Sequence, residues 1–371
     1  MSRPRQILAI GASRGGVGDV FGRAVAELRA RGHAVQVVVV PSGRWPAAAA
    51  LRTVWRTRRL LAQAESVHIE FGSGDVEVFW FALAATRQRA DCVVVAHDHP
   101  ELAHHPAAAL VPAGTRLGRG LAHRVLCPLL DGRLGRRLLG QAGVLVVLGE
   151  AAARERRAQG VSRVLAIRHG SDPPGRELAP PSRGECVLFA GFVGPGKGVD
   201  VLLAAWRALR GDAGLPLVLA GAATPPNDAW LASQLTAGDS GPDAPRILGE
   251  IPDEREFQGL IERAAVVVLP YRRSSPASGI LVRAMRAGRA IVATPVPAVE
   301  GLIEDGHSGL LVPPGDAGAL AQAIRRLAGD PPLRDRLGAA AAATAARELT
   351  WQRHVAGLER AYAAAAELGG R

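Results

Sequence analysis

The chain has 371 residues, 48% of them hydrophobic, which is enough for two folded domains with hydrophobic cores. No segment is long and apolar enough to span a bilayer, and a predicted strand starts at Gln6, so we expect no signal peptide and a cytoplasmic protein. The three cysteines, Cys92, Cys127 and Cys186, lack the spacing of a metal site. Two of them lie in apolar stretches, which indicates buried free thiols in a reducing compartment.

The net charge of +11 is concentrated in the first half of the chain. Residues 1–175 hold 24 arginines and 13 acidic residues, whereas residues 176–371 hold 21 basic and 21 acidic residues. This excess favours an anionic partner, such as a membrane surface, an anionic acceptor or nucleic acid. Aromatic residues make up only 4% of the chain and no DNA- or RNA-binding motif is present, so we expect no nucleic-acid partner.

Short apolar segments separated by helical patterns predict a parallel α/β domain over residues 1–175. Its strands are expected at residues 6–10, 35–40, 67–71, 92–96, 144–148 and 164–167. A glycine-rich stretch at residues 11–18 follows the first strand and precedes a helix that stops at Gly32. Its spacing, G-x-x-x-G-G-x-G, is not the dinucleotide fingerprint, so the stretch does not predict a nicotinamide cofactor.

Residues 51–63 predict an amphipathic helix with an apolar and a basic face. The apolar residues are Leu51, Val54, Trp55 and Leu61, and the basic ones are Arg52, Arg56 and Arg59. Two interpretations are open. The helix lies in the interface of an anionic membrane, or its apolar residues pack on the sheet and its arginines are solvated.

A His-Asp pair, His97-Asp98, follows the predicted strand at 92–96. The carboxyl ends of parallel strands are where α/β domains bind ligands, although a single histidine at such a place is more often structural. His104 and His105 are expected to form a loop pair rather than a ligand set.

Prolines and glycines between residues 173 and 181 predict a linker to a second α/β domain. Strands are expected there at residues 186–190, 215–220, 266–269 and 290–293, with helices between them. Further helices are expected at residues 316–328, 331–346 and 350–366, with a flexible alanine-rich run in the second of these.

The strand at residues 186–190 leads into a glycine-rich loop that contains Lys197, the single lysine among 45 basic residues. A strand, a glycine loop and a helix together place backbone N–H groups and a helix N-terminus at an anion. An ammonium retained in an arginine-rich chain points to a role that a guanidinium cannot fill. Chance survival at an exposed turn is the alternative.

The segment FAGFVGPGKGVDVLLAAW resembles the KG loop of retaining glycosyltransferases of family 4, the "glycosyl transferases group 1" type. The segment from Gly301 to Asp316 also matches that family closely. The resemblance implies the GT-B fold, with two Rossmann-like α/β domains whose parallel sheets face a central cleft. It assigns residues 1–175 to the acceptor side and residues 176–345 to the nucleotide sugar, and it implies that residues 346–371 form a helix crossing back to the first domain.

The resemblance also implies a metal-independent transfer from a nucleotide-diphosphate sugar, with no further cofactor, to a glycan, a lipid-linked or a small-molecule acceptor. The catalytic candidates are Lys197, His97 and Asp98. Candidates for the donor and its phosphates are Gly196, Gly198, Arg272, Arg273, Ser278, Gly279, Ile280 and Glu300. The candidates on the acceptor side are Gly15, Gly16 and Val17, which alternatively serve only a tight turn.

The chain departs from the family at the E-x7-E motif, where Ser275 and Arg283 occupy the places of the two glutamates. Arg272 or Arg273 would replace lost positive charge at the phosphates, or would be solvated. The missing carboxylates leave open a non-catalytic relative that kept the fold. A GT-B epimerase is a third possibility, but it requires carboxylates and histidines at the cleft that the sequence does not identify. The sugar, the base and the acceptor are not defined by the sequence.

Overall fold

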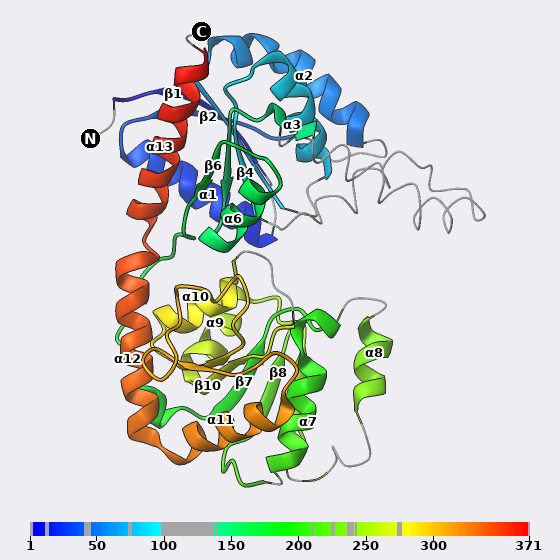
Figure 1. Ribbon diagram of the computed structural model, residues 1–371, viewed down its shortest axis with the longest axis vertical. Helices are drawn as coiled ribbons and strands as arrows, with labels where there is room; N and C mark the ends of the chain where they lie inside the picture. The colour runs from blue at the N-terminus through cyan, green and yellow to red at the C-terminus, as the bar shows by residue number, and fades with distance from the viewer. Residues whose placement is uncertain are drawn as a thin grey trace, which may run out of the picture. The chain divides into compact units, whose positions relative to one another are not determined.

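The chain folds into two units, each built around a six-stranded parallel sheet (Figure 1). The computed structural model describes residues 3–11, 15–40, 46–72, 76–97, 137–138, 140–209, 211–223, 227–235, 241, 243–272 and 277–369. Unit 1 comprises Met1–Gly170 with Trp351–Arg371, and unit 2 comprises Ser171–Thr350. Each division falls five residues from the boundary that the sequence predicts.

The sheet of unit 1 has the strand order β2-β1-β3-β4-β5-β6. Its strands are β1 (Gln6–Gly11), β2 (Ala34–Val38), β3 (Ser66–Phe71), β4 (Val93–Ala96), β5 (Val144–Val147) and β6 (Val164–Ala166). Its helices are α1 (Gly15–Ala30), α2 (Pro46–Gln63), α3 (Val76–Gln88), α6 (Glu150–Ala158) and α13 (Trp351–Gly369). Since β2 and β3 lie on opposite sides of β1, the strand order reverses between β1 and β3.

Both faces of this sheet are buried, which explains its nearly continuous apolar strands. Successive side chains of β1 point to opposite faces. Ile7 and Ala9 pack with α1 and α13, whereas Leu8 and Ile10 belong to the cluster that includes α2 and α3. Figure 1 shows these two pairs of helices on the two sides of the sheet.

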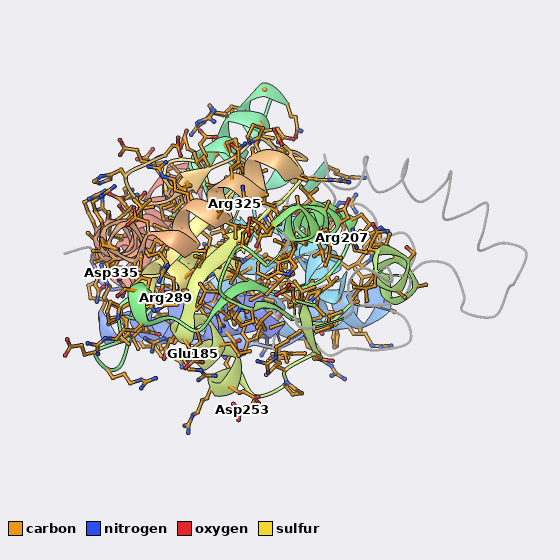
Figure 2. All side chains as sticks on the ribbon, turned by 90° about the horizontal axis from the view of Figure 1, so that it is seen from below. Glu185, Arg207, Asp253, Arg289, Arg325 and Asp335 are labelled. Carbon is orange, nitrogen blue, oxygen red and sulfur yellow. The ribbon has the colours of Figure 1, made fainter. Side chains whose placement is uncertain are left out.

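The sheet of unit 2 has the order β12-β11-β10-β7-β8-β9 and reverses between β7 and β10, with three strands on each side of that point, against two and four in unit 1. Its strands are β7 (Cys186–Ala190), β8 (Leu217–Ala220), β9 (Arg246–Gly249), β10 (Ala264–Leu269), β11 (Ala290–Ala293) and β12 (Leu310–Leu311). Its α-helices are α7 (Val199–Leu209), α8 (Asn227–Gln234), α9 (Glu254–Arg263), α10 (Gly279–Arg286), α11 (Ala317–Gly329) and α12 (Pro331–Glu348). Asp253, which caps α9, projects from the outer edge of the molecule in Figure 2, whereas Arg289 is buried.

Three expectations about individual elements were wrong. The alanine-rich run is a regular part of α12, and its Ala341 and Ala345 are fully buried. Small side chains let a helix approach its neighbours closely, so alanine here indicates packing. The expected glycine loop after β1 is already helical from Gly15, because α1 begins there. Strands β9 and β12 were missed, since the first is a largely exposed edge strand and the second has two residues.

Cys92 and Cys186 are buried and free, as expected, while Cys127, His104 and His105 lie outside the described residues. Burial raises the pKa of the Cys92 thiol to about 12 and that of Cys186 to about 11. Within the described part of the chain, no helix combines the length and the apolar character needed to cross a membrane.

Candidate functional site

The candidate donor residues of unit 2 lie where the strand order reverses, at the neighbouring carboxyl ends of β7 and β10. Open α/β sheets bind ligands at such a point, because the loops leaving the two strands diverge there. In this unit the two loops contact each other, since the amide of Arg272 donates to the carbonyl oxygen of Gly196 at 3.0 Å.

The glycine loop after β7 has a conformation that its sequence requires. Pro195–Lys197 form one 3-10 turn, and Gly198 follows with a φ of +69°. A side chain at Gly198 would also overlap the carbonyl oxygen of Pro270. Glycine therefore permits both the left-handed backbone and the close contact between the two loops.

Lys197 and the start of α10 are connected through one buried tyrosine. The Lys197 ammonium lies 4.4 Å from the ring centroid of Tyr271, which is a cation–π distance. The Tyr271 hydroxyl shares a hydrogen bond of 3.1 Å with the hydroxyl of Ser278. Burial raises the pKa of Tyr271 to about 12, although the bond to Ser278 opposes this, so the phenol stays neutral.

The N-terminus of α10 is organised by Ser278, whose side-chain oxygen accepts from the amide of Leu281 at 3.2 Å. Gly279, which is exposed, and Ile280, which is half-buried, form the beginning of the helix, where the backbone dipole favours an anion. The Ile280 side chain lies beside Gly191 at the end of β7. The structure thus brings Lys197, Ser278, Gly279 and the glycine loop together.

The arginines and glutamates expected near this site have other surroundings. Arg272 forms an ion pair with Asp200 of α7, at 2.6 Å, which offsets its charge. Arg283 forms an ion pair with Glu254 of α9 and lies over the ring of Phe257, so it has a packing partner where the family has its second glutamate.

Glu300 is exposed in the turn after β11, where its amide donates to the carbonyl oxygen of Val296. Arg273 and Ser275 lie outside the described residues.

The candidate residue of unit 1, His97, belongs to a buried polar cluster at the carboxyl edge of the first sheet. Its Nε2 lies 2.6 Å from Oε1 of Glu70, and Nε2 of His68 lies 2.9 Å from Oε2 of the same carboxylate. The hydroxyl of Tyr362 on α13 lies 2.8 Å from Nδ1 of His68. Asp98 lies outside the described residues, and Gly15, Gly16 and Val17 form the first turn of α1.

Glu70 was missed by the sequence reasoning. Burial alone would raise the pKa of its carboxyl, but hydrogen bonds from His68 and His97 and their charges hold it well below the usual range. The motif that could have revealed Glu70 is SVHIEF, which places His68 and Glu70 two residues apart in a wholly buried strand. Two ionisable residues facing the same side of a buried strand must satisfy each other.

Two further histidines face this cluster within unit 1. Burial, with the charge of His97, lowers the pKa of His169 to about 4. Burial also lowers the pKa of His354, whose Nδ1 lies 2.8 Å from the carbonyl oxygen of Arg168. Among the residues that the structure describes, no group of histidine, cysteine and acidic side chains could hold a metal ion.

Comparison with known proteins identifies relatives of both units. Residues 184–330 match the profile of the family described as "Glycosyl transferases group 1". The chain is 33% identical over 195 residues to a phosphatidyl-myo-inositol mannosyltransferase of Mycobacterium leprae, in a match that covers 52% of this chain and 50% of that protein. It is 26% identical over 385 aligned positions to a glycogen synthase of Mycobacterium tuberculosis, covering 95% of this chain and 91% of that protein.

The solved structure of Anabaena HepE in complex with UDP superposes with a TM-score of 0.69 and covers 96% of this chain and 99% of that one. At 16% identity, this likeness shows the fold alone. The two parallel-sheet units, with this structural likeness, show the GT-B fold. The match to the group 1 glycosyltransferase profile, over residues 184–330, lies in the second unit.

Proposed function

We propose that the protein is a retaining glycosyltransferase that moves a sugar from a nucleotide-diphosphate sugar to an acceptor. One observation carries the proposal: Lys197, Tyr271 and Ser278 connect an ammonium to a helix N-terminus where the strand order of unit 2 reverses. Both groups favour a diphosphate, and neither needs a metal ion or a further cofactor. The relatives support it, since one is named a mannosyltransferase and another is a structure with UDP.

The chemistry follows from where negative charge develops. The bond between the anomeric carbon and the β-phosphate oxygen breaks, and the electron pair stays on the departing nucleoside diphosphate. The acceptor oxygen forms the new bond to the same carbon and loses its proton. The ammonium of Lys197 and the amides at the start of α10 stabilise the charge that grows on the leaving phosphate.

His97 has a different role in this proposal, because it belongs to unit 1 and to a carboxylate cluster rather than to a phosphate loop. We assign it to the transferring sugar, as the resemblance to family 4 implies. This role concerns turnover and not the affinity for a nucleoside diphosphate.

A thermal-shift panel with UDP, GDP, ADP and their sugar conjugates, with and without EDTA, tests the proposal. A nucleotide that binds only the folded protein stabilises it by about 2.7 kcal/mol at a hundredfold excess over its Kd. We expect one base to give a clear shift that EDTA leaves unchanged, and its sugar conjugate to be turned over. A shift abolished by EDTA, or no shift with any nucleotide, would contradict the proposal.

A non-catalytic relative that retains nucleotide binding is the second candidate function. The observation that favours it is the ion pair of Arg283 with Glu254, since an arginine held by α9 stands where the family has a sugar-binding carboxylate. The same panel separates the two candidates. Nucleotide binding without release of nucleoside diphosphate from any sugar conjugate would support the non-catalytic role.

We also propose peripheral contact with an anionic membrane through the outer face of α2, defined as Leu51, Arg52, Trp55, Arg56 and Arg59. Leu51 and Trp55 are 58% and 65% exposed, while Val54 and Leu61 on the same helix are buried. The side chains predicted to form one apolar face therefore divide into a buried and an exposed pair. Exposed apolar side chains interleaved with arginines are typical of an interfacial helix.

Co-sedimentation with anionic and with neutral vesicles tests this contact. We expect binding to anionic vesicles that salt reverses, and each arginine near the surface contributes about 1 kcal/mol. The variant R52Q/R56Q/R59Q should lose binding, and the matched variant R246Q/R255Q/R325Q, with three exposed arginines of unit 2 replaced, should keep it. Without sedimentation of the wild-type protein at low salt, a soluble acceptor would be favoured.

A further inference from the structure

The carboxylate of Glu70 connects two histidines inside unit 1. Its two oxygens lie 2.9 Å from Nε2 of His68 and 2.6 Å from Nε2 of His97, so each histidine ring has its own oxygen. Glu70 is fully buried and His68 is 1% exposed, whereas His97 is 8% exposed at the end of β4. Of these three side chains, His97 is therefore the most exposed.

The strand register explains why these groups meet. Glu70 pairs with Gly11 of β1 and with Val95 of β4, one residue before the end of β3. The amide of His97 donates to the carbonyl oxygen of Phe71 at 3.1 Å, which continues the pairing of β3 with β4 past Ala96. Both side chains are thus fixed by the sheet and not by a loop, which gives the contact a defined geometry.

A buried carboxylate is stable as an anion only beside donors and positive charge. Both histidines must offer N–H groups to Glu70, because an ionised carboxylate only accepts hydrogen bonds. The Nε2 atom of each ring therefore bears hydrogen. The other ring nitrogen of His68, Nδ1, faces the hydroxyl of Tyr362. The other ring nitrogen of His97 is likewise Nδ1.

We propose that Glu70 is a positioning residue that holds His97 with hydrogen on Nε2 and presents its Nδ1 to the substrate. This inference rests on the proposed function, in which His97 acts on the transferring sugar. The same interaction gives the Nε2 hydrogen of His97 an acceptor within the protein. His97 thereby serves as an oriented polar group of the site.

Tyr362 and His68 support Glu70 from the other side. The phenol of Tyr362 is fully buried, and burial raises its pKa well above the usual value, so the hydroxyl stays protonated. It can then donate to Nδ1 of His68, and the Nε2 of that ring faces Glu70. The series Tyr362, His68, Glu70 and His97 extends from α13 to the end of β4.

Nitrogen-15 NMR of the histidine rings tests the proposal without any substrate. The signals of His97 are assigned by their loss in His97→Gln, and the protonated nitrogen is read from its coupling to hydrogen. We expect hydrogen on Nε2 of His97 in the wild-type protein at pH 7. In Glu70→Gln, whose amide can donate as well as accept, we expect His97 to lose this preference. Unchanged His97 signals in Glu70→Gln would overturn the proposal.

The activity measurement uses the nucleotide sugar that the thermal-shift panel selects, with UDP-glucose as the first probe. Glu70→Gln should lower kcat about 10- to 100-fold, in the range seen when a carboxylate that orients a histidine is lost. It should leave the affinity for UDP unchanged and alter the pH dependence of kcat. Four other titratable groups lie around Glu70 and His97 and must be considered when that pH dependence is interpreted, namely His68, His169, His354 and Tyr362.

Matched variants separate this inference from the proposed function and from loss of folding. Glu65→Gln makes the same change at an exposed carboxylate just before β3 and should match the wild-type protein. If His97→Ala keeps full turnover, the proposed role of His97 fails. If His97→Ala is impaired while Glu70→Gln keeps both turnover and the His97 signals, only the positioning role fails. Should Glu70→Gln not fold, Tyr362→Phe, which retains the ring, replaces it in the test. We expect this variant to shift the His68 signals more than the His97 signals, because the lost hydroxyl contacts His68.

Discussion

Both units have a six-stranded parallel sheet whose strand order reverses once, but the chemistry at the point of reversal differs. In unit 2 the candidate groups lie on loops and on a helix start, and glycines let the backbone approach a ligand. In unit 1 they lie in the strands β3 and just after β4, where a carboxylate and two histidines are buried together. Two parallel sheets therefore carry two different candidate sites, one built from backbone groups and proposed for phosphate, and one built around a buried charge.

Because of this difference, we expect the two units to contribute differently to nucleotide binding and to turnover. Loop amides and an ammonium recognise a diphosphate in the ground state and in the transition state alike, so they affect both affinity and rate. A histidine fixed by a buried carboxylate offers one oriented nitrogen and little binding surface. Damage to unit 2 should weaken nucleotide binding, whereas damage to unit 1 should lower turnover alone.

Lys197 gives the largest expected effect. Lys197→Ala should slow transfer about 100- to 1,000-fold, comparable to losing one transition-state donor, and should also weaken UDP binding. Lys197→Arg should be impaired as well, because a planar guanidinium fork places its donors differently from the compact ammonium that would face the phosphate. Steady-state kinetics and UDP titration measure both effects, and Arg325→Ala on the exposed side of α11 is the control. Full activity of Lys197→Arg would show that the single lysine is an accident of composition.

His97 gives the next largest effect and tests the other side of the comparison. His97→Ala should lower kcat about 100-fold, within the range for a positioned acid–base group, while UDP binds with unchanged affinity. Single-turnover kinetics and the same titration measure the two quantities separately. Unchanged turnover together with a lower melting temperature would assign His97 a structural role instead.

The sequence predicted the fold from local patterns, and it failed where the structure depends on contacts between distant residues. The apolar run 187–190 followed by glycines and a helical period identifies β7, the glycine loop and α7, because each pattern is local. Glu70 has no local pattern of this kind. Its partner His97 is 27 residues away, and Tyr362, bonded to His68, lies on α13, so only the folded sheet brings them together.

The sequence also could not assign Arg283. Alignment places it at a missing glutamate, but its ion pair with Glu254 depends on how α9 packs against α10. By contrast, the sequence could predict that the loop of Gly198 makes a close backbone contact, because glycines in a loop after a strand indicate such contacts, although it could not name Pro270 as the partner.

Acid should destabilise unit 1 and leave unit 2 nearly unaffected. The pKa of His169 is lowered to about 4 in the folded state, against about 6.5 in an unfolded chain. Between these values the unfolded chain binds a proton that the folded chain does not, so the free energy of unfolding falls as pH decreases from 6.5 to 4. The loss should be on the order of 1–3 kcal/mol.

Unit 2 provides the internal control, because its single histidine, His307, is exposed. Denaturant unfolding followed by hydrogen exchange reports on each unit separately. His169→Gln should flatten the pH dependence of unit 1 between pH 6.5 and 5, with a remainder from His354, whose pKa burial also lowers. The same slope in wild type and variant would show that His169 is not the group responsible.

The smallest effect concerns Tyr271, which connects the two groups of unit 2 that are proposed to bind phosphate. Tyr271→Phe keeps the ring under the Lys197 ammonium but removes the hydrogen bond to Ser278, so it should cost about 1 kcal/mol of stability. UDP binding should change little, because Ser278 can still accept from the amide of Leu281. Tyr271→Leu also removes the cation–π contact and should weaken UDP binding further.

The UDP affinities of these two variants show whether the ring or the hydroxyl of Tyr271 matters for binding. Calorimetric titration should rank the wild-type protein and Tyr271→Phe close together, with Tyr271→Leu clearly weaker. If Tyr271→Phe weakened binding as much as Tyr271→Leu, the hydroxyl, and therefore the cap of α10, would be the group on which phosphate binding depends. The phosphate site would then depend on a buried side-chain hydrogen bond, as the cluster around Glu70 does, and the contrast between the two units would no longer hold.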